Sequence, residues 1–319
     1  MSEHILGIDI GGTKSAVVMA RNNGEILARR ALPTEGEPEV MLQKLAALAQ
    51  EIQAEYGVKR EDIVGVGVSV GGPLNTATGV VHSPPNLPQW KAVPVRAFFE
   101  RSLGLPVRVE NDANANALAE WKLGAGRGAT NLIFMTFGTG IGAGLILNGK
   151  LVRGANDLAG EVGHQTILMN GPKCGCGKRG CLEALASGPA IARLARESMM
   201  YGRHKRVLAL AGGKPGDIEA FHVVEAAKEG DPFAIQILEE AGTYLGVGLA
   251  NLIQILNPEK IILGTIAVHA GELILGPARR AIAEYAWPRS ADVCEIVPAG
   301  LGDRSQDLAA IALWLDDER

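Results

Sequence analysis

The sequence predicts an α/β protein of two lobes, with a ligand cleft between the lobes and a structural zinc loop. An apolar strand, a glycine-rich loop and a second apolar strand occur at residues 6–20 and again at 132–147. Duplicated halves that face one another suit a ligand site between domains. The length of 319 residues suggests about two domains, and 47% hydrophobic residues with 41 glycines is typical of an α/β protein rich in turns.

The first half alternates strands and helices. Period-two patterns predict strands at 5–10, 14–20 and 25–31, and apolar residues at helical spacing predict a helix over 41–52. A β-branched run at 63–70 is typical of a buried strand, and prolines 84, 85 and 88 indicate a rigid loop. A short strand at 107–110 leads into an alanine-rich helix that begins at Asn111-Asp112 and runs to about Leu123.

The second half contains strands 132–137 and 143–147 and then becomes mostly helical. Asp231-Pro232 is an N-cap followed by proline at the first helical position, and apolar residues from 235 to 256 line one helix face. Strands are expected at 260–263 and 293–297, and a final helix at 306–315. We expect lobes at 1–118 and 119–302, with a zinc element at 164–183 and a C-terminal helix, about 303–319, packed back on the first lobe.

Four metal-binding side chains lie within one short segment: His164, Cys174, Cys176 and Cys181. Three thiolates and one imidazole complete a tetrahedral zinc site and leave no open position, so the ion is expected to be structural. The alternative is a pair of oxidised cysteines beside an unrelated histidine. Glu161 and Glu183 flank the segment and are either polar groups of a binding site or solvated surface residues.

Composition excludes several classes of function. The net charge of −4 gives no reason to expect nucleic acid or an anionic membrane as a partner. The N-terminus lacks the basic flank of a signal peptide, and the apolar region 244–267 is interrupted at 257–260. A reduced thiol cluster with one further cysteine, Cys294, fits a cytoplasmic protein.

Two glycine loops are candidates for holding phosphate. Residues 9–14 read Asp-Ile-Gly-Gly-Thr-Lys and residues 138–142 read Gly-Thr-Gly-Ile-Gly. Glycines let backbone N–H groups approach phosphate oxygens, Thr13 and Lys14 add donors, and Asp9 suits the magnesium shell. The Walker spacing is absent. Taken alone, the first loop is equally compatible with a plain hairpin turn, and the second loop favours the nucleotide interpretation.

Asp112 is the candidate general base, because it lies where a strand gives way to a helix beside a second polar residue, Asn111. A carboxylate there can accept the proton of a hydroxyl that attacks a γ-phosphoryl group. The alternative is that the aspartate only caps the helix. Glu161, His164 and Glu183 could accept hydrogen bonds from a polyol, with the metal fixing the imidazole.

Seven motifs carry a family resemblance. They are Asp9-x-Gly11-Gly12-Thr13-Lys14, Gly71-Gly72-Pro73, Pro85-Asn86-Leu87-Pro88-x-Trp90, Glu110-Asn111-Asp112-Ala113-Asn114, Gly138-Thr139-Gly140-Ile141-Gly142-x-Gly144, Glu161-x-Gly163-His164 and Cys174-x-Cys176-Gly177-x-x-Gly180-Cys181-Leu182-Glu183. In this order they resemble the ROK family of bacterial sugar kinases and sugar-responsive repressors. The resemblance implies a two-lobed actin-like ATPase (ribonuclease H-like) fold.

The resemblance also implies residue roles, with Asp112 as catalytic base. The sugar-holding residues would be Gly72, Asn111, Asp112, Glu161, His164 and Glu183. The residues facing ATP and Mg²⁺ would be Asp9, Gly11, Gly12, Thr13, Lys14, Gly138, Thr139, Gly140 and Gly264. Zn²⁺ would be held by His164, Cys174, Cys176 and Cys181.

Two segments depart from the family pattern. The adenosine-side loop normally has a glycine pair, but here Gly264 is followed by Thr265, and residues 304–307 read Arg-Ser-Gln-Asp instead of the usual small residues. Both departures concern the contacts to the base of the nucleotide.

The favoured function is an ATP-dependent, glucokinase-like transfer of phosphate to the primary (C6) hydroxyl of a hexose, by a protein that resembles dimeric relatives. N-acetylmannosamine or another hexose or N-acetylhexosamine is the alternative substrate. A non-catalytic sugar-sensing repressor is a different class, but family repressors carry a DNA-binding domain ahead of the sugar region, and here the first loop starts at Asp9. An actin-like ATPase acting on a protein or a non-sugar acid is a third hypothesis.

Overall fold

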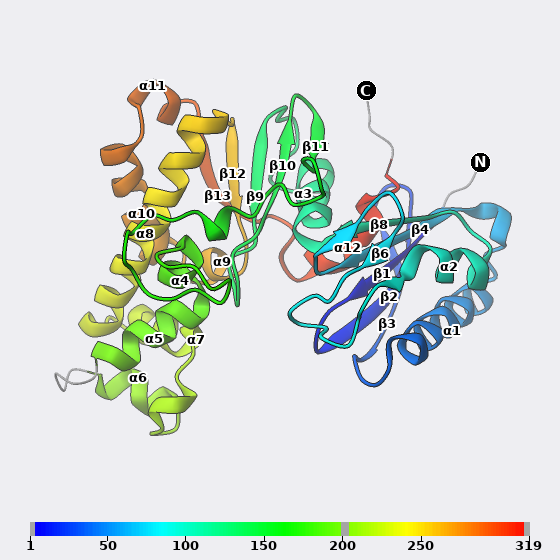
Figure 1. Ribbon diagram of the computed structural model, residues 1–319, viewed down its shortest axis with the longest axis horizontal. Helices are drawn as coiled ribbons and strands as arrows, with labels where there is room; N and C mark the ends of the chain where they lie inside the picture. The colour runs from blue at the N-terminus through cyan, green and yellow to red at the C-terminus, as the bar shows by residue number, and fades with distance from the viewer. Residues whose placement is uncertain (1–3, 199–203, 316–319) are drawn as a thin grey trace.

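Two five-stranded sheets with the same strand order form the framework of the molecule (Figure 1). The computed structural model describes residues 4–198 and 204–315. The first sheet has the order β3-β2-β1-β4-β8 and the second the order β11-β10-β9-β12-β13. Each has a three-stranded antiparallel part continued by parallel strands. The repeat expected from the sequence is therefore confirmed, since both halves fold with one topology.

The first sheet is covered by helices on both faces. Its strands are β1 (His4–Ile10), β2 (Lys14–Arg21), β3 (Ile26–Pro33), β4 (Ile63–Val70) and β8 (Val107–Asn111). Alternate residues of β1 face opposite sides: Leu6, Ile8 and Ile10 pack with α1 (Pro38–Tyr56), while Ile5 packs with α12 (Ser305–Ala312). The helix α2 (Val95–Leu103) lies on the α1 side. Strand β4 is buried along nearly its whole length, as its continuous apolar run predicts.

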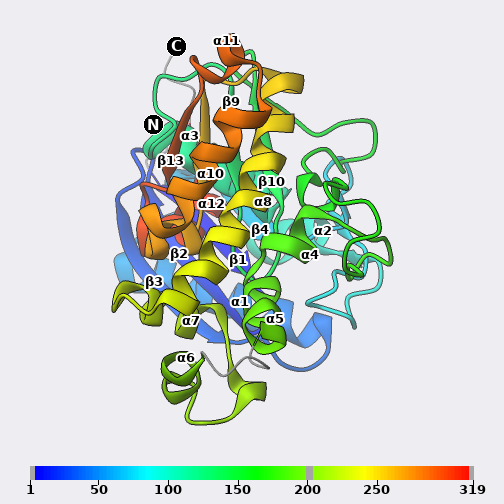
Figure 2. The ribbon, with the colours of Figure 1, turned by 90° about the vertical axis from the view of Figure 1, so that its left-hand side faces the viewer.

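The second sheet carries the larger helical layer. Its strands are β9 (Leu132–Met135), β10 (Ala143–Leu147), β11 (Lys150–Val152), β12 (Lys260–Leu263) and β13 (Glu295–Pro298). The long helix α8 (Pro232–Leu256) is capped by Asp231, whose Oδ1 accepts the N–H of Ala234 at 2.9 Å. It packs along α10 (Glu272–Tyr285), as Figure 2 shows.

Short elements complete the fold. A small sheet, β5 (Leu74–Asn75), β6 (Val80–Val81) and β7 (Val93–Pro94), follows β4. The remaining helices are α4 (Leu182–Ala186), α5 (Gly188–Ser198), α6 (Lys205–Leu210), α7 (Ala220–Lys228), α9 (Ile266–Ala270) and α11 (Pro288–Ala291). None of the helices in the described residues is long and apolar enough to cross a membrane.

Helix α3 (Asp112–Leu123) lies at the junction of the two sheets. It packs against β9 and β10 and also against α12, so a lobe boundary at residue 118 falls inside a helix that both lobes share. The carboxylate of Glu120, fully buried, accepts the N–H groups of Ala125 (2.8 Å), Gly300 (3.1 Å) and Leu301 (3.0 Å). One side chain thus ties together the two chain segments that cross between the lobes.

The C-terminal segment packs on the first sheet. The single Nε–H of Arg29 is shared by the two carboxylate oxygens of Asp307, 8% exposed, at 3.0 and 2.8 Å, and Ser305 Oγ lies 2.6 Å from Asn116 Oδ1. Two of the polar residues that depart from the family pattern therefore anchor α12 to β3 and α3. Residues 316–319, which the sequence assigned to the same helix, lie outside the described part of the chain.

Candidate active site

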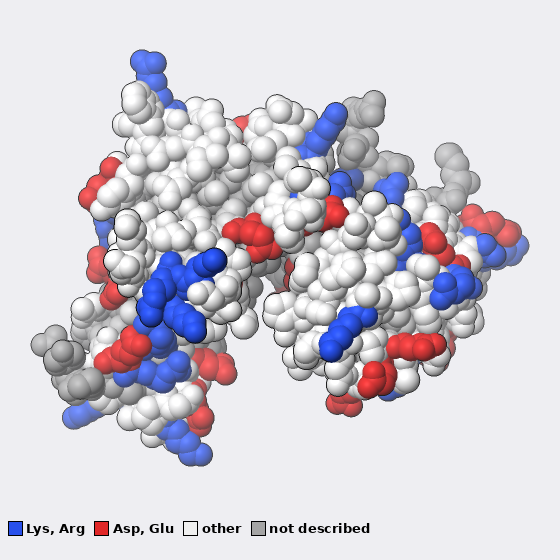
Figure 3. All heavy atoms as spheres, viewed as in Figure 1, with Lys and Arg blue, Asp and Glu red and all other residues white. Residues whose placement is uncertain are grey.

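Three polar residues, Asp9, Ser69 and Glu110, lie side by side near one edge of the first sheet. Strands β1, β4 and β8 run parallel, with Asp9 in register with Ser69 and Ser69 with Glu110. Parallel strands end at the same edge, where α/β proteins bind ligands. Space filling shows a hollow between the lobes with acidic side chains on its wall (Figure 3).

Asp9 and Asp112 are two buried carboxyl groups at this edge, and both have a raised pKa. Burial, and next the charge of Asp112, raise the pKa of Asp9 to about 7. Burial likewise raises the pKa of Asp112 above its ordinary value, although backbone N–H groups partly offset the effect. Two carboxylates that both disfavour ionisation form a site that would gain from a bound cation.

Asn111, and not Asp112, is the N-cap of α3. Its Oδ1 accepts the N–H groups of Ala113 at 2.9 Å and of Asn114 at 3.4 Å. Asp112 is the first helical residue, and its Oδ1 accepts the N–H of Ala113 at 2.8 Å. The capping role is therefore filled by the neighbouring amide, which leaves the second carboxylate oxygen of Asp112 for another partner.

The first glycine loop, at residues 11–14, packs against the proline loop at residues 84–88. A side chain on Gly12 would come within 2.7 Å of the backbone oxygen of Asn86, and one on Gly71 within 3.0 Å of the Asn86 Oδ1. Gly12 is thus required for close packing of two loops, a requirement that the phosphate hypothesis did not foresee. Gly11 donates its N–H to the Lys14 oxygen at 3.2 Å, and Thr13 and Lys14 are exposed.

The second glycine loop is tied to the cysteine-rich segment by Glu183. The Oε2 of Glu183 accepts the N–H of Ile141 at 2.9 Å, and a side chain on Gly140 would come within 2.9 Å of the same oxygen. Gly138 accepts the N–H of Gly188 at 2.8 Å. Gly138 and Thr139 line a cavity described below.

The four sequence-predicted metal ligands come together. The ligand atoms of His164, Cys174, Cys176 and Cys181 lie within 4.8 Å of one another. The Sγ atoms of Cys176 and Cys181 are 3.7 Å apart, and Cys174 Sγ is 3.7 Å from His164 Nδ1. Thiolates bound to one tetrahedral zinc ion at about 2.3 Å would be separated by about 3.8 Å. All four cysteines are free thiols, so an oxidised pair is not present.

His164 presents its two ring nitrogens to different neighbours. Nδ1 faces the cysteines, whereas Nε2 lies 3.7 Å from the Glu161 Oε2. Glu161 is exposed, so its carboxylate is accessible to a ligand. On the opposite lobe, a side chain on Gly72 would come within 3.0 Å of the Asn111 Nδ2, which places the Gly71-Gly72 loop beside the N-cap.

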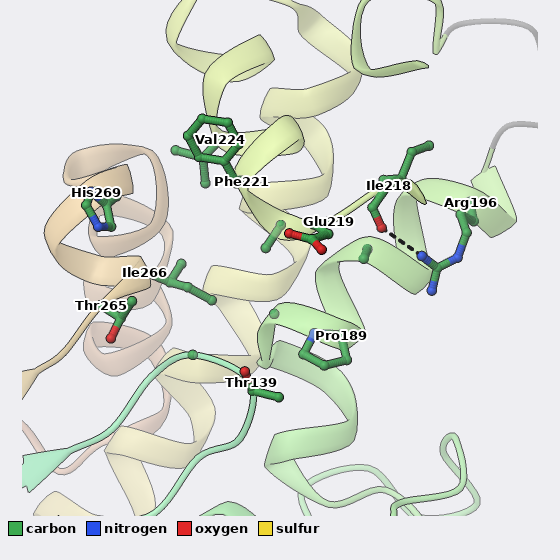
Figure 4. Close-up of a pocket in the computed structure, with 14 residues that line it drawn as sticks. Thr139, Pro189, Arg196, Ile218, Glu219, Phe221, Val224, Thr265, Ile266 and His269 are labelled. Atoms are coloured by element: carbon green, nitrogen blue, oxygen red, sulfur yellow. Dashed lines mark hydrogen bonds between the residues drawn. The ribbon is translucent and has the colours of Figure 1, made fainter. Parts of the chain in front are cut away.

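A cavity of about 510 Å³ opens beside the second glycine loop (Figure 4). Its walls come from the glycine loop, α5, α7 and α9, and include Thr139, Pro189, Glu219, Phe221, Thr265 and His269. Gly264 itself supports the wall by donating its N–H to Met135. The residues from α5 and α7 were not identified from the sequence, because helical surface residues carry no local signal that they line a cavity.

Thr265 stands where the family resemblance expects a second glycine. Its φ is +25° and its ψ −82°, a conformation that β-branched residues rarely adopt. The side chain lines the cavity and lies 3.9 Å from the Cβ position of Gly138.

Comparison with known families matches residues 5–317 to the ROK family. The chain belongs to the ROK family. A glucokinase of Halalkalibacterium halodurans is 37% identical to this ROK chain over 93% of the chain and 91% of the relative. A xylose repressor of Caldicellulosiruptor bescii is 32% identical over 98% of the chain and 78% of the relative.

The fold is shared with a solved ROK glucokinase. The structure of the Streptomyces griseus enzyme in complex with glucose and AMPPNP superposes with a TM-score of 0.82 and 34% identity, covering 98% of this chain and 99% of that one. The expected actin-like, two-lobed architecture of the ROK glucokinases is thereby confirmed.

Proposed function

We propose that this protein is an ATP-dependent sugar kinase that phosphorylates glucose at its primary (C6) hydroxyl. The observation that carries the proposal is the arrangement of Asp112 at the sheet edge, with its second carboxylate oxygen unused by the helix cap. Glucokinases at 35–37% identity and the glucose–AMPPNP complex of a ROK relative support the substrate and the donor.

In the proposed reaction, the glucose O6 hydroxyl donates to Asp112, which takes the proton as the oxygen attacks the γ-phosphorus and ADP leaves. A carboxyl whose pKa is raised by burial is a better base than an ordinary aspartate. Gly72, Asn111, Glu161, His164 and Glu183 would hold the other sugar hydroxyls. Rearrangement of the lobes around both substrates would exclude water from the phosphoryl group.

The two glycine loops would hold ATP from opposite sides. Gly11, Gly12, Thr13 and Lys14 would meet the phosphates from the first lobe, and Gly138, Thr139 and Gly140 from the second. The 510 Å³ cavity, whose wall Gly264 supports, would hold the adenosine. Asp9 fits a magnesium shell, because the charge of Arg29 and a hydrogen bond from Ser69 only partly offset the burial of its carboxylate, whose pKa remains raised. Magnesium, when bound with ATP, would neutralise charge on the transferred phosphoryl group.

His164, Cys174, Cys176 and Cys181 would hold a structural zinc ion, as their spacing supports. Zinc bound to Nδ1 would orient the Nε2 of His164 toward the sugar. The free thiols support a reducing, cytoplasmic location, and the family resemblance supports a homodimer. Zinc analysis of the purified protein and light scattering test the zinc site and the dimer.

A coupled ADP-release assay across hexoses and N-acetylhexosamines, with ATP and Mg²⁺, tests the proposal. Glucose should give the highest kcat/KM, and Asp112→Asn provides the inactive control. A preference for N-acetylmannosamine would redirect the substrate within the same reaction. The absence of any sugar-dependent ADP release, together with sequence-specific DNA binding, would instead favour the regulatory function that the xylose repressor relatives have.

A further inference from the structure

One segment of the second lobe contacts the first lobe at two points. Residues 153–157 follow β11, and both ends of this segment bind the other lobe: Arg153 pairs with Glu110 on β8, and Asp157 pairs with Thr76 beyond β5. Neither pair belongs to the sugar-holding, phosphate-holding or metal-holding groups described above. Both pairs nevertheless lie close in the chain to residues of those groups.

The Thr76–Asp157 contact uses two hydrogen bonds. Asp157 Oδ2 accepts the backbone N–H of Thr76 at 3.0 Å, and Oδ1 accepts its hydroxyl at 2.8 Å. Thr76 stands four positions after Gly72, and Asp157 stands four positions before Glu161. The contact therefore joins the chain segment that follows the Gly71-Gly72 loop of one lobe to the segment of the other lobe that leads to Glu161 and His164.

The Glu110–Arg153 contact involves a residue that stands two positions before the candidate base, Asp112, in the chain. Glu110 is 2% exposed, and its Oε2 accepts the Arg153 Nε at 2.8 Å. Its Oε1 accepts the N–H of Asn111 at 2.9 Å and the Asn114 amide at 3.0 Å. One buried carboxylate thus links the first turn of α3, where Asp112 stands, to the second lobe.

We propose that the Thr76–Asp157 and Glu110–Arg153 contacts form an interlobe clamp that positions the sugar-holding segment of the second lobe against Asp112. The four are positioning residues, since none of them touches the reacting atoms. The inference rests on the proposed sugar kinase activity. None of the four residues lines the cavity beside the second glycine loop, so the clamp should affect sugar binding more than ATP binding.

Matched variants in one turn test the first contact. Thr76→Val removes the hydroxyl that reaches Asp157, whereas Thr78→Val removes a hydroxyl that bonds only within the turn, to Asn75. Loss of one hydrogen bond across the lobes should raise the glucose KM by about threefold to tenfold. Thr78→Val should leave the glucose KM unchanged, and the ATP KM should stay within about twofold in both variants.

A second pair of variants tests the partner side chain of this contact. Asp157→Asn keeps one acceptor and tolerates the positive φ of 62°, so it should retain more glucose affinity than Asp157→Ala.

Two arginine variants test the second contact, one at Arg153 and a control at Arg108 on β8. Arg153→Met should lower kcat/KM for glucose more than Arg108→Met does. The guanidinium of Arg108 stacks on Trp314 and donates to the backbone oxygen of Leu313, away from the clamp. Melting temperatures of both variants separate lost stability from lost positioning. If the contacts act together, Thr76→Val should have a smaller effect in the Arg153→Met background than in the wild type.

The outcomes distinguish the clamp from the proposed function. A wild-type protein without sugar-dependent phosphorylation would remove the function itself. An active wild type in which Thr76→Val and Thr78→Val behave alike, or in which Arg153→Met changes the melting temperature but not the glucose parameters, would overturn the clamp. Equal rises in the KM values for glucose and ATP would also overturn it.

Discussion

Glu183 binds Ile141: its Oε2 accepts the Ile141 N–H at 2.9 Å. The same side chain places its other oxygen 3.7 Å from Cys174 Sγ and 4.0 Å from His164 Nδ1. A residue expected only to hold sugar therefore also joins the cysteine cluster to the second glycine loop. A change in the cysteine-rich segment can therefore affect the position of the second glycine loop through the Glu183 carboxylate.

Loss of a metal ligand should weaken sugar binding more than ATP binding. Cys176→Ala removes one of four ligands, and we expect loss of bound zinc, a lower melting temperature and a glucose KM raised by about tenfold. The ATP KM should change less, because Glu183 reaches only one backbone group of the loop. Cys294→Ala, outside the cluster, is the control. A collapse of ATP affinity with unchanged glucose affinity would show that the zinc segment serves the nucleotide.

Replacement of the candidate base should abolish turnover and spare sugar binding. General-base catalysis contributes about 100-fold to 10,000-fold to a rate, so Asp112→Asn should lose at least about 100-fold in kcat. Calorimetry should still detect glucose binding, because the other sugar-holding residues are intact. A kcat near the wild-type value would assign the base to another residue.

The raised pKa of Asp9 predicts a pH-dependent stability of the metal-free protein. Its folded pKa of about 7 lies above the ordinary value of 3.8. Between these two values the folded state binds more protons than the unfolded state, so the free energy of unfolding should fall as the pH rises from about 4 to 7. Above pH 7 this contribution is constant.

Asp9→Asn should reduce that slope, with the remainder coming from Asp112, whose pKa is also raised, and denaturant titrations at several pH values measure it. Mg²⁺ with ATP should also flatten the slope in the wild type, because a bound cation favours the ionised carboxylate. An unchanged slope in Asp9→Asn would mean that other groups cause the pH dependence.

Thr265→Gly should stabilise the protein. The threonine holds a φ of +25°, and strain of this kind costs about 1–3 kcal/mol. Glycine accepts positive φ without a Cβ penalty, so the melting temperature should rise. Thr265→Val keeps the β-branched shape and should show no gain. A lower melting temperature in the glycine variant would show that the side-chain contacts of Thr265 outweigh its strain.

Local patterns predicted most of the elements, because each follows from its own periodicity. Strands β4, β10 and β12 have the expected ends, and α8 begins at Pro232 after its Asp231 cap. Other ends were less accurate: the helix expected at 41–52 spans Pro38–Tyr56, although a proline in its first turn and a left-handed Gly57 mark its ends, and the strand expected at 293–297 is Glu295–Pro298. The cysteine cluster was predictable, since its ligands are close in the chain and their chemistry is specific.

The sequence by itself determined the repeat, the cluster of candidate metal ligands and the position of Asp112 at the start of a helix, because each follows from patterns that are local in the chain. Only the tertiary structure decided which groups meet across the chain: Glu183 on Ile141, Asp307 on Arg29, and Thr76 on Asp157. Hydrogen bonds act over about 3 Å and carry no record in the spacing of distant residues. Their partners are fixed when the two sheets and the helices between them pack.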